Sequence, residues 1–347
     1  MKPTKLPLGD ISVNFVGAIV ATLRSLQVDP RPLMQRFNLS QEFMHTPNAR
    51  ISIPKFMRLG YEAIRLSNTP QFGLLMGPNM KVTEIGMAGF AAMSAPTLYD
   101  AMTTLIDYET LSSQNCRGHS RHYSEDGRLV CEFYSISPYN QFNYFVVDSM
   151  LSTWYLLACW FSERKDLIHQ VDIEHGNQSY RDAYESLFEC PINFSASRNA
   201  LVLKRGVETS ANRFGCRSSY AQTRSLCEEI KQELSRGKTT TDRVVELIGS
   251  HLSGDPPDIG LIAQKMGMAG WTLRRRLNEE GTQFKALLDE TRHALARTYV
   301  GDTEHNFTEI AFLLGFSSPA AFQRAFKRWT TQTPGQFRKI HANESKL

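Results

Sequence analysis

The sequence lacks a hydrophobic run long enough to cross a bilayer. Its most apolar stretch, MLSTWYLLACWF from Met150 to Phe161, has only 12 residues, whereas a membrane-spanning helix needs roughly 20. The N-terminal residues MKPTKLPLGDISVNF also lack the apolar core of a secretory signal peptide. We therefore expect a cytoplasmic protein without membrane contact, in which the apolar stretch forms a core helix.

Clustered cysteines are missing as well, and this favours reduced thiols in a cytoplasm. Six cysteines are spread along the chain without a CxxC pair: Cys116, Cys131, Cys159, Cys190, Cys216 and Cys227. The segment CRGHSRH places Cys116, His119 and His122 at metal-like intervals. In an alternating strand, however, residues 119 and 122 point to opposite faces, and no fourth ligand is signalled. We interpret the segment as a polar strand end and predict no metal site.

Signatures of catalysis are absent too. The sequence contains no Ser-His-Asp order, paired-carboxylate spacing, glycine-rich phosphate loop or HExxH motif. The 39 Lys and Arg against 35 Asp and Glu give a net charge of only +4, too little to coat nucleic acid or a membrane by charge alone. We expect a protein that is not an enzyme, has no catalytic residues and needs no cofactor, and whose basic function is local.

The hydrophobic periodicity predicts a mixed first portion of the chain. Residues 14–111 repeat apolar side chains three and four apart, which indicates helices. From 116 to 143 the pattern alternates and contains Asp126-Gly127, a tight-turn signal, so we predict a hairpin. Helix returns through Phe161. A strand in HQVDIEH, a helix in SYRDAYESLF and two short strands around an Asn-Ala turn in INFSASRNALVLKR complete an α+β domain.

A change of fold class follows this portion. We predict a helix from Ser218 to Leu234, with Leu226, Ile230 and Leu234 on its apolar stripe, and then a linker in SRGKTTT. Beyond the linker the pattern shows helices and short turns without strands. The predicted parts are a mixed domain at 1–217, a helix and linker at 218–239, and an all-α domain at 240–347.

The all-α part contains an internal repeat. IAQKMGMAGWTLRRRL from Ile262 aligns with IAFLLGFSSPAAFQRAF from Ile310, with one extra residue in the second turn. Each copy has a short helix with a small Ala, a Gly suited to a left-handed turn, and a second helix with a basic face. This pattern is typical of a helix-turn-helix, whose second helix lies in the major groove of DNA.

The second copy, SSPAAFQRAFKRW, predicts an amphipathic helix. Its aromatic residues and Ala325 fall within one arc of roughly 100°, and the basic side chains point the other way. Ser318 is a good N-cap and Pro319 fits the first helical position. We predict that the aromatic side chains pack into the core while the basic ones face DNA.

The outward side chains of both second helices are the predicted DNA contacts. Arginine can bond guanine O6 and N7 in two places, glutamine can do so with adenine, and lysine suits phosphate. The flat body of an outward tryptophan can press on thymine methyls. The predicted contacts are Trp271, Arg274, Arg275, Asn278, Ala320, Gln323, Arg324 and Lys327.

GFSSPAAFQRAFKRWTTQTPGQFR resembles the signature of the AraC/XylS regulators. The family pattern runs through EIA, LGF, F-x-R-x-FK-R and TP-x-x-[FY]-R, which this chain matches from Glu309 to Arg338. The resemblance implies that FKALLDETRHALARTYV ties two helix-turn-helix units into one rigid module, so that both recognition helices enter successive major-groove faces, about 34 to 36 Å apart. Ala269 and Gly270 depart from the cap-forming residues common in the family, so the first recognition helix lacks a side-chain cap.

The first portion resembles the sensor region called arabinose-binding-type, found in ornithine-utilisation and virulence or quorum-sensing regulators. The resemblance covers most of residues 14–215 and is carried by LQVDPRPLMQRFNLS, NARISIPKFMRLGYEAIRLSNTPQFGLLMG, GMAGFAAMSAPTLYDAMTTLIDY and YESLFECPINFSASRNALVL. It implies a helix-rich α+β sensor domain with a small antiparallel sheet, not a cupin barrel. The regional name does not imply that arabinose binds.

These features together predict a sequence-specific DNA-binding transcriptional regulator, an activator. Residues 1–217 would sense a small-molecule effector of unknown identity, and residues 240–347 would bind double-stranded promoter DNA. We expect RNA polymerase as a partner, a location on the nucleoid, and a homodimer formed through the sensor or the 218–234 helix, although the helix's stripe could instead pack on its own domain.

Three points stay open. An effector-independent architectural DNA-binding protein is one alternative. A DNA-repair alkyltransferase-type regulator is another: Cys190 and Cys216 would be its candidate thiols, but the clustered zinc-cysteine site and the PCHR-like acceptor loop are missing. The aromatic run from Tyr139 to Phe161 either walls the effector pocket or belongs to the core.

Overall fold

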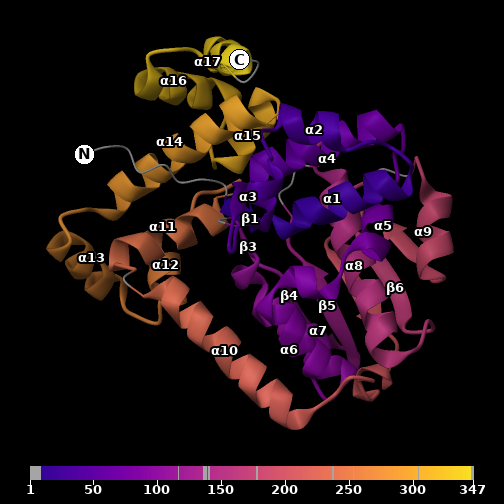
Figure 1. Cartoon of the computed structure of the whole chain (residues 1–347). Coiled ribbons are helices and arrows are strands. Elements are labelled where there is room, and N and C mark those ends of the chain that lie inside the picture. The colour runs from indigo at the N-terminus through magenta and orange to yellow at the C-terminus, as the bar shows by residue number, and fades with distance from the viewer. Residues whose placement is uncertain are drawn as a thin grey trace. The chain divides into compact units, whose positions relative to one another are not determined.

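The structure is a computed structural model that describes residues 9–115, 117–135, 139, 141–176, 179–236, 238–252, 254–303 and 305–344. Its contacts divide the chain into two compact units. The first unit holds residues 10–114 and 119–234, and the second holds Gly9, residues 115–118 and the chain from 235 onward. The five-stranded sheet belongs to the first unit, whereas helices α11 to α17 build the second (Figure 1).

Helices dominate the start of the first unit, as the periodicity of residues 14–111 predicts. They are α1 (Asn14–Ser25), α2 (Arg31–Arg36), α3 (Gln41–His45), α4 (Ile53–Ser67), α5 (Phe72–Met76), η1 (Gly77–Asn79), η2 (Val82–Ile85), α6 (Met87–Ser94), α7 (Leu98–Asp107) and η3 (Glu109–Leu111). A small sheet of order β2-β1-β3 joins β1 (Gly9–Ser12), β2 (Arg50–Ser52) and β3 (Ser113–Asn115). These strands have three or four residues each, too few to show an alternating pattern.

The main sheet has the order β4-β5-β8-β6-β7. Its strands are β4 (Arg121–Glu125), β5 (Arg128–Phe133), β6 (Ile168–Ile173), β7 (Ile192–Phe194) and β8 (Asn199–Leu203). The predicted hairpin is confirmed, because β4 and β5 pair antiparallel around Asp126 (φ 49°) and Gly127 (φ 68°), both in the left-handed conformation that a tight hairpin turn needs. The strand predicted in HQVDIEH is β6, and the helix predicted after it is α9 (Arg181–Phe188).

One strand prediction is partly wrong. The chain does form β7 and β8, but Asn199 and Ala200 lie inside β8 instead of in a turn. The two strands do not pair with each other: β7 joins β6 in parallel, and β8 lies on the other side of β6, antiparallel to it. The sheet is therefore antiparallel except for its β7 edge. A strand of three residues carries no signal for its partner, so only the folded chain decides this pairing.

Helix α8 (Tyr144–Ser162) is the central helix of the first unit, which confirms the predicted core helix. It contributes Phe145 to an apolar cluster around α1 and α4, and Leu151 to a second cluster against the sheet. Within the described residues α8 alone is long and apolar enough to resemble a membrane span, but 61% of that apolar window is buried in the protein. A Cβ on Gly73 of α5 would lie 2.6 Å from the Asp148 Cβ, so glycine lets the two helices touch.

Helix α10 (Arg217–Ser235) follows η4 (Val207–Thr209) and confirms the helix predicted over 218–234. One side of it packs on its own unit: the Tyr220 Oη lies 2.9 Å from the Thr104 Oγ1, and the Lys231 Nζ donates to a main-chain carbonyl of α7. Leu226 and Leu234 lie outside the contact between α10 and α7 and are 40% and 41% exposed. The apolar stripe is thus only partly used within the unit.

The second unit consists of helices joined by short connections. They are α11 (Thr240–His251), α12 (Ile259–Lys265), α13 (Gly270–Glu279), α14 (Phe284–Asp302), α15 (Phe307–Leu313), α16 (Pro319–Thr330) and α17 (Pro334–Glu344). The two copies of the repeat are α12–α13 and α15–α16. Gly267 (φ 67°) and Gly315 (φ 64°) turn each copy in the left-handed conformation, as predicted.

Two arginines donate hydrogen bonds to the backbone where α15 ends and the turn of the second copy begins. Arg292 of α14 donates to the carbonyls of Leu314 (2.9 Å) and Gly315 (2.6 Å). Arg117, whose short segment groups with this unit, is 2% exposed and donates to the carbonyls of Leu313 and of α11. The last carbonyls of a helix lack partners within it and favour positive charge. Both guanidinium groups therefore stabilise the end of α15.

The helix starts agree with the sequence. The Ser318 side chain accepts a hydrogen bond from the Ala321 N–H (3.2 Å), and Pro319 occupies the first position of α16. Ala269 takes the extended N-cap conformation before α13 but provides no side-chain acceptor. The missing cap of the first recognition helix is thus confirmed.

We predict that Ala269→Ser stabilises the start of α13 by about 1 kcal/mol, because the new hydroxyl can accept a hydrogen bond from the first turn. Hydrogen exchange of the α13 amides, followed by mass spectrometry, should slow by roughly fivefold. Ala320→Ser is the matched control, because Ser318 already caps α16. Equal or faster exchange in Ala269→Ser would contradict the prediction.

The carboxylate of Glu109 is a pH-sensitive contact of the first unit. It accepts hydrogen bonds from the Ser120 N–H (2.9 Å) and hydroxyl (3.0 Å), which ties the segment before β4 to η3. Burial raises the pKa of Glu109 from its ordinary 4.5 to about 7, although these two bonds act against the rise. An acid with a raised pKa in the folded state stabilises the fold fully below its unfolded pKa, and this contribution is lost as pH rises through the folded pKa.

We therefore predict that the thermal midpoint of the first unit falls between about pH 5 and pH 8, and that Glu109→Gln flattens this slope because the amide has no proton to lose. Melting curves at several pH values test this. Glu233→Gln on the exposed side of α10 is the control with the same chemical change. An unaltered slope in Glu109→Gln would show that another group causes the pH dependence.

Candidate nucleic-acid interface

The outward face of α13 carries four of the predicted DNA contacts. Leu273 and Leu277 are buried on the opposite side. The four predicted contacts, Trp271, Arg274, Arg275 and Asn278, are all exposed, as are Arg276 and Glu279 of the same helix. Trp271 is 68% exposed, and the Arg275 guanidinium lies 5.8 Å from its ring centroid, within range of a cation–π contact. The Trp271 ring and the Arg275 guanidinium thus lie side by side on the outward face of α13.

Helix α16 carries the other four predicted DNA contacts. Phe322 and Phe326 are buried, and the exposed face carries Ala320, Gln323, Arg324 and Lys327. The helix contains three basic and no acidic residues. Among the described residues, the Arg324 and Lys327 side chains have no ion-pair or hydrogen-bond partner. Their donors therefore remain available to an anionic ligand.

Trp329 lies on the inner side of α16, as predicted for the aromatic residues. Its ring stacks on His293 of α14 at a centroid distance of 5.2 Å and lies 6.0 Å from the ring of Phe316. The indole N–H points to the Asp289 Oδ2 (3.4 Å), to which Arg328 also approaches (3.5 Å). Of the three basic residues of α16, Arg328 is thus turned toward α14, and the other two face outward.

Helix α14 links the two helix-turn-helix copies. It starts directly after α13 and packs against α15, α16 and α17, so α13 lies near one end of it and α16 near the other (Figure 1). Its 19 residues give a length of about 28 Å at 1.5 Å per residue. Successive major-groove faces of B-DNA repeat every 34 to 36 Å, so a helix of this length is suited to hold two recognition helices one DNA turn apart.

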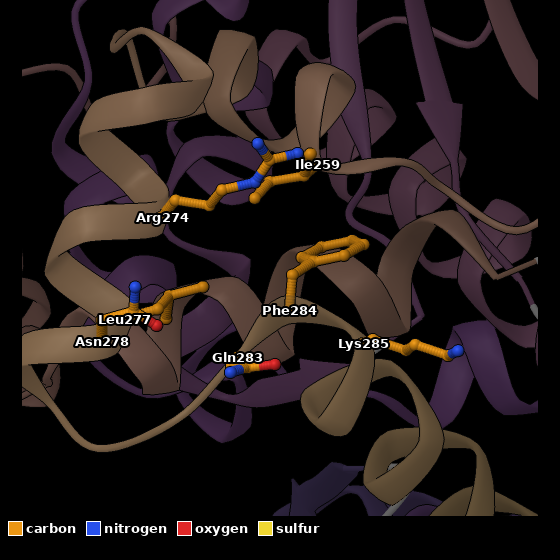
Figure 2. Close-up of a pocket in the computed structure, with 7 residues that line it drawn as sticks. All are labelled: Ile259, Arg274, Leu277, Asn278, Gln283, Phe284 and Lys285. Carbon is orange, nitrogen blue, oxygen red and sulfur yellow. The ribbon is translucent and has the colours of Figure 1, made fainter.

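A groove of about 380 Å³ lies beside α13. Figure 2 shows the Arg274 guanidinium next to Ile259 on one side, with the Phe284 ring below it and Lys285 extending from the start of α14. The complete lining is Ile259, Arg274, Leu277, Asn278, Gln283, Phe284 and Lys285. The groove therefore joins two predicted contacts with two residues that sequence reasoning missed, Gln283 and Lys285.

A signal for Lys285 exists in the sequence. The first turn of α14 contains a lysine and no acidic residue, although the positive end of the helix dipole favours acidic side chains there. An uncompensated positive helix start beside a basic helix favours an anion such as phosphate.

The structure bears differently on the metal site and on the two candidate thiols. Among the described residues, no group of three or more His, Cys, Asp and Glu side chains could hold a metal ion. His122 pairs with Asp107 (Nε2 to Oδ1, 3.1 Å), and Cys116 lies outside the described residues. Burial raises the pKa of the Cys190 thiol to about 11, which does not favour it as a nucleophile. Hydrogen bonds from Ser218 and Ser219 lower the pKa of the exposed Cys216 thiol to about 7.

Comparison with known proteins gives two family matches. Residues 28–207 match the family model described as the arabinose-binding domain of AraC transcription regulator, N-term. Residues 262–340 match a helix-turn-helix domain. The second match contains both copies of the repeat and all eight predicted DNA contacts.

Three relatives are named as regulators or activators, and two of them align over more than nine-tenths of this chain. The chain is 24% identical to the ornithine utilization regulator of Pseudomonas aeruginosa over 329 residues, covering 95% of this chain and 96% of that protein. It is 25% identical to the transcriptional regulator VirS of Mycobacterium tuberculosis over 333 residues, covering 91% and 92%. A urease operon transcriptional activator of Escherichia coli is 29% identical over 167 residues, covering 46% and 52%.

Among solved structures, the transcriptional regulator CdpR of Pseudomonas aeruginosa matches 89% of this chain and 97% of its own, with 22% identity and a TM-score of 0.44. The sensor match alone extends over more than half of the 347 residues, and the helix-turn-helix match follows it in the order that the sequence predicts. The chain belongs to the AraC family of DNA-binding transcription regulators.

Proposed function

We propose that this regulator is a sequence-specific activator that reads one promoter site with α13 and α16 together, under the control of a small molecule bound by its first unit. The observation that carries the proposal is the pair of exposed basic faces, on two helix-turn-helix copies of one unit, joined by a helix about 28 Å long. A single chain could then contact two successive turns of the major groove.

The exposed side chains suggest distinct roles on DNA. Arg275 and Arg324 suit bidentate bonds to guanine, and Gln323 suits adenine. Lys327 on α16 and Lys285 at the start of α14 suit phosphate, because a lysine ammonium is a compact point charge. Trp271 offers its flat face to thymine methyls.

The proposal for activation, effector control and dimerisation is supported by the names of relatives and by the exposed stripe of α10. One relative is named an activator and another a regulator of ornithine utilization, which favours activation through RNA polymerase and a small-molecule signal. The exposed Leu226 and Leu234 on α10 favour a homodimer formed along that helix. An architectural protein without an effector would not need a first unit of this size.

We predict that Arg324→Ala weakens binding to the preferred site by about 1 to 3 kcal/mol, roughly 5- to 150-fold, and relaxes the base preference at one position. Lys327→Ala should weaken all sequences alike. Titration of labelled duplexes, preferred and scrambled, measures both. Lys339→Ala on the exposed side of α17 is the matched charge-loss control. If Arg324→Ala binds both duplexes as the unaltered chain does, α16 is not a recognition helix.

The affinity should also fall steeply with salt. The logarithm of the binding constant should decrease linearly with the logarithm of salt concentration, with a slope of about −0.9 per neutralised phosphate. Lys285→Ala and Lys327→Ala should each make this slope shallower by about 1. A slope that Lys285→Ala leaves unchanged would remove that lysine from the phosphate contacts.

A further inference from the structure

A buried carboxylate in the first unit is held by two tyrosines. Asp148 on α8 has no exposed surface and accepts hydrogen bonds from the hydroxyls of Tyr180 (2.6 Å) and Tyr184. The two phenol rings stack with an interplanar angle of 7°. Burial raises the pKa of the Tyr184 hydroxyl, so it stays a donor. The carboxylate is therefore positioned firmly, in a place from which water is excluded.

Next to this carboxylate lies an imidazole whose hydrogen-bonding capacity is unused. His175 follows β6, and its side chain is 1% exposed. Its Nε2 lies 3.5 Å from the Asp148 Oδ1, close enough for charge attraction but too long for a good hydrogen bond. Within the part of the chain that is described, neither ring nitrogen has a hydrogen-bond partner. An imidazole always carries at least one N–H, and buried donors are normally bonded.

Aromatic rings surround the imidazole. The ring centroids of Tyr144, Tyr139 and Phe194 lie 4.7, 5.6 and 6.3 Å from that of His175. Tyr139 and Tyr144 stand at the start of the aromatic run for which the sequence left pocket and core as alternatives. The end of the run at Phe161 is buried core, and Tyr139 also packs against that core.

A second carboxylate adjoins the imidazole. Glu174 accepts hydrogen bonds from the Tyr139 hydroxyl and from the Asn199 amide (2.6 Å). Among the described residues, neither Glu174 nor Asp148 has a lysine or arginine partner. The imidazole lies near Asp148 and acts electrostatically on Glu174. Burial raises the pKa of Glu174, because a buried negative charge without a cationic partner is unfavourable.

We propose that this cluster is a binding site for a small organic cation that carries a protonated amine. We call it the Asp148–His175 site; it comprises Asp148, Glu174, His175 and the rings of Tyr139, Tyr144 and Phe194. An ammonium group is attracted by both carboxylates and by the faces of the rings, and its N–H can donate to a neutral imidazole nitrogen. The ligand would thus satisfy the unbonded His175 and balance the charge. The inference rests on the proposed function, in which the first unit senses a small molecule.

The test uses three primary amines and the alcohols that match them in shape. The purified full chain is titrated by calorimetry with n-butylamine, 1,4-diaminobutane and 2-phenylethylamine, and with 1-butanol, 1,4-butanediol and 2-phenylethanol. We expect at least one amine to bind in a 1:1 ratio and to raise the melting temperature of the first unit, and its alcohol to bind at least about tenfold more weakly. If no amine binds, or if the alcohols bind equally well, the inference is wrong.

Variants locate the site. Asp148→Asn and His175→Phe should each weaken amine binding by about tenfold or more. Asp182→Asn, the same change at an exposed position of α9, should leave it unaltered. Because Asp148 is buried, near-ultraviolet circular dichroism must show that each variant is folded. Tyr144→Leu, which removes one ring and no charge, provides a milder second variant and should weaken amine binding several-fold. Folded variants that bind the amine as tightly as the unaltered chain would overturn the assignment.

A DNA measurement separates this inference from the function on which it rests. Specific DNA binding by a chain that binds none of the amines would uphold the regulator and overturn the site. Amine binding that depends on Asp148 and His175 would uphold the site, even in a chain that shows no preference for any DNA sequence.

Discussion

Each recognition helix must bury one apolar face, and the remaining structure of the second unit depends on this constraint. Leu273 and Leu277 pack inward on α13, and Phe322 and Phe326 on α16. At roughly 100° per residue, a rotation of either helix by one position would turn an apolar side chain into water and a basic one into the core. Inward packing thus fixes the rotation of both helices, and with it the set of side chains that face outward.

The second constraint is the distance between the two faces. A flexible connection would let the two helix-turn-helix copies move independently, whereas the continuous helix α14 fixes the distance between them. Trp329, stacked on His293 and directed at Asp289, packs α16 firmly against α14. Arg292 secures the turn before α16 from the same helix. The relative position of α13 and α16 is therefore set within the unit, and under the proposed function this would reduce the entropy lost when both helices bind one DNA site.

The first unit is organised around polar groups that it buries. Burying a carboxylate is unfavourable unless hydrogen bonds or charges compensate for the lost water. Glu109 accepts hydrogen bonds from Ser120, Asp148 accepts them from two tyrosines, and Glu174 accepts them from a tyrosine and a side-chain amide. Among the described residues, neither ring nitrogen of His175, next to Asp148, has a hydrogen-bond partner.

Much of this architecture follows from the sequence, and the failures have physical causes. The 3.6-residue hydrophobic period correctly predicts the long helices, and Asp126-Gly127 correctly predicts the hairpin, because each signal is local in the sequence. The pairing of β7 with β6 was missed because partner choice depends on the whole sheet. The eight predicted DNA contacts came from a repeated pattern, and the structure leaves all of them exposed.

Two groups of residues could not be found in this way. Lys285 carries a weak local signal, at the start of α14, that acquires meaning only when the groove beside Arg274 is known. Asp148 and His175 come from a helix and from the end of a strand, and they are brought together by the packing of α8 on the sheet. The spacing of residues in the sequence does not predict such a contact, because the two side chains belong to different elements and are not related by a helix or strand period.

The most direct test of a regulator that reads DNA with both helices is selection of bound sequences from a random duplex pool by the purified full chain. We predict one enriched motif that spans about two helical turns, roughly 20 base pairs, with two contacted segments one turn apart. Arg324→Ala should relax the base preference at one position of one segment and leave the other segment unchanged. A pool without enrichment, or a motif confined to a single segment, would contradict joint recognition by α13 and α16.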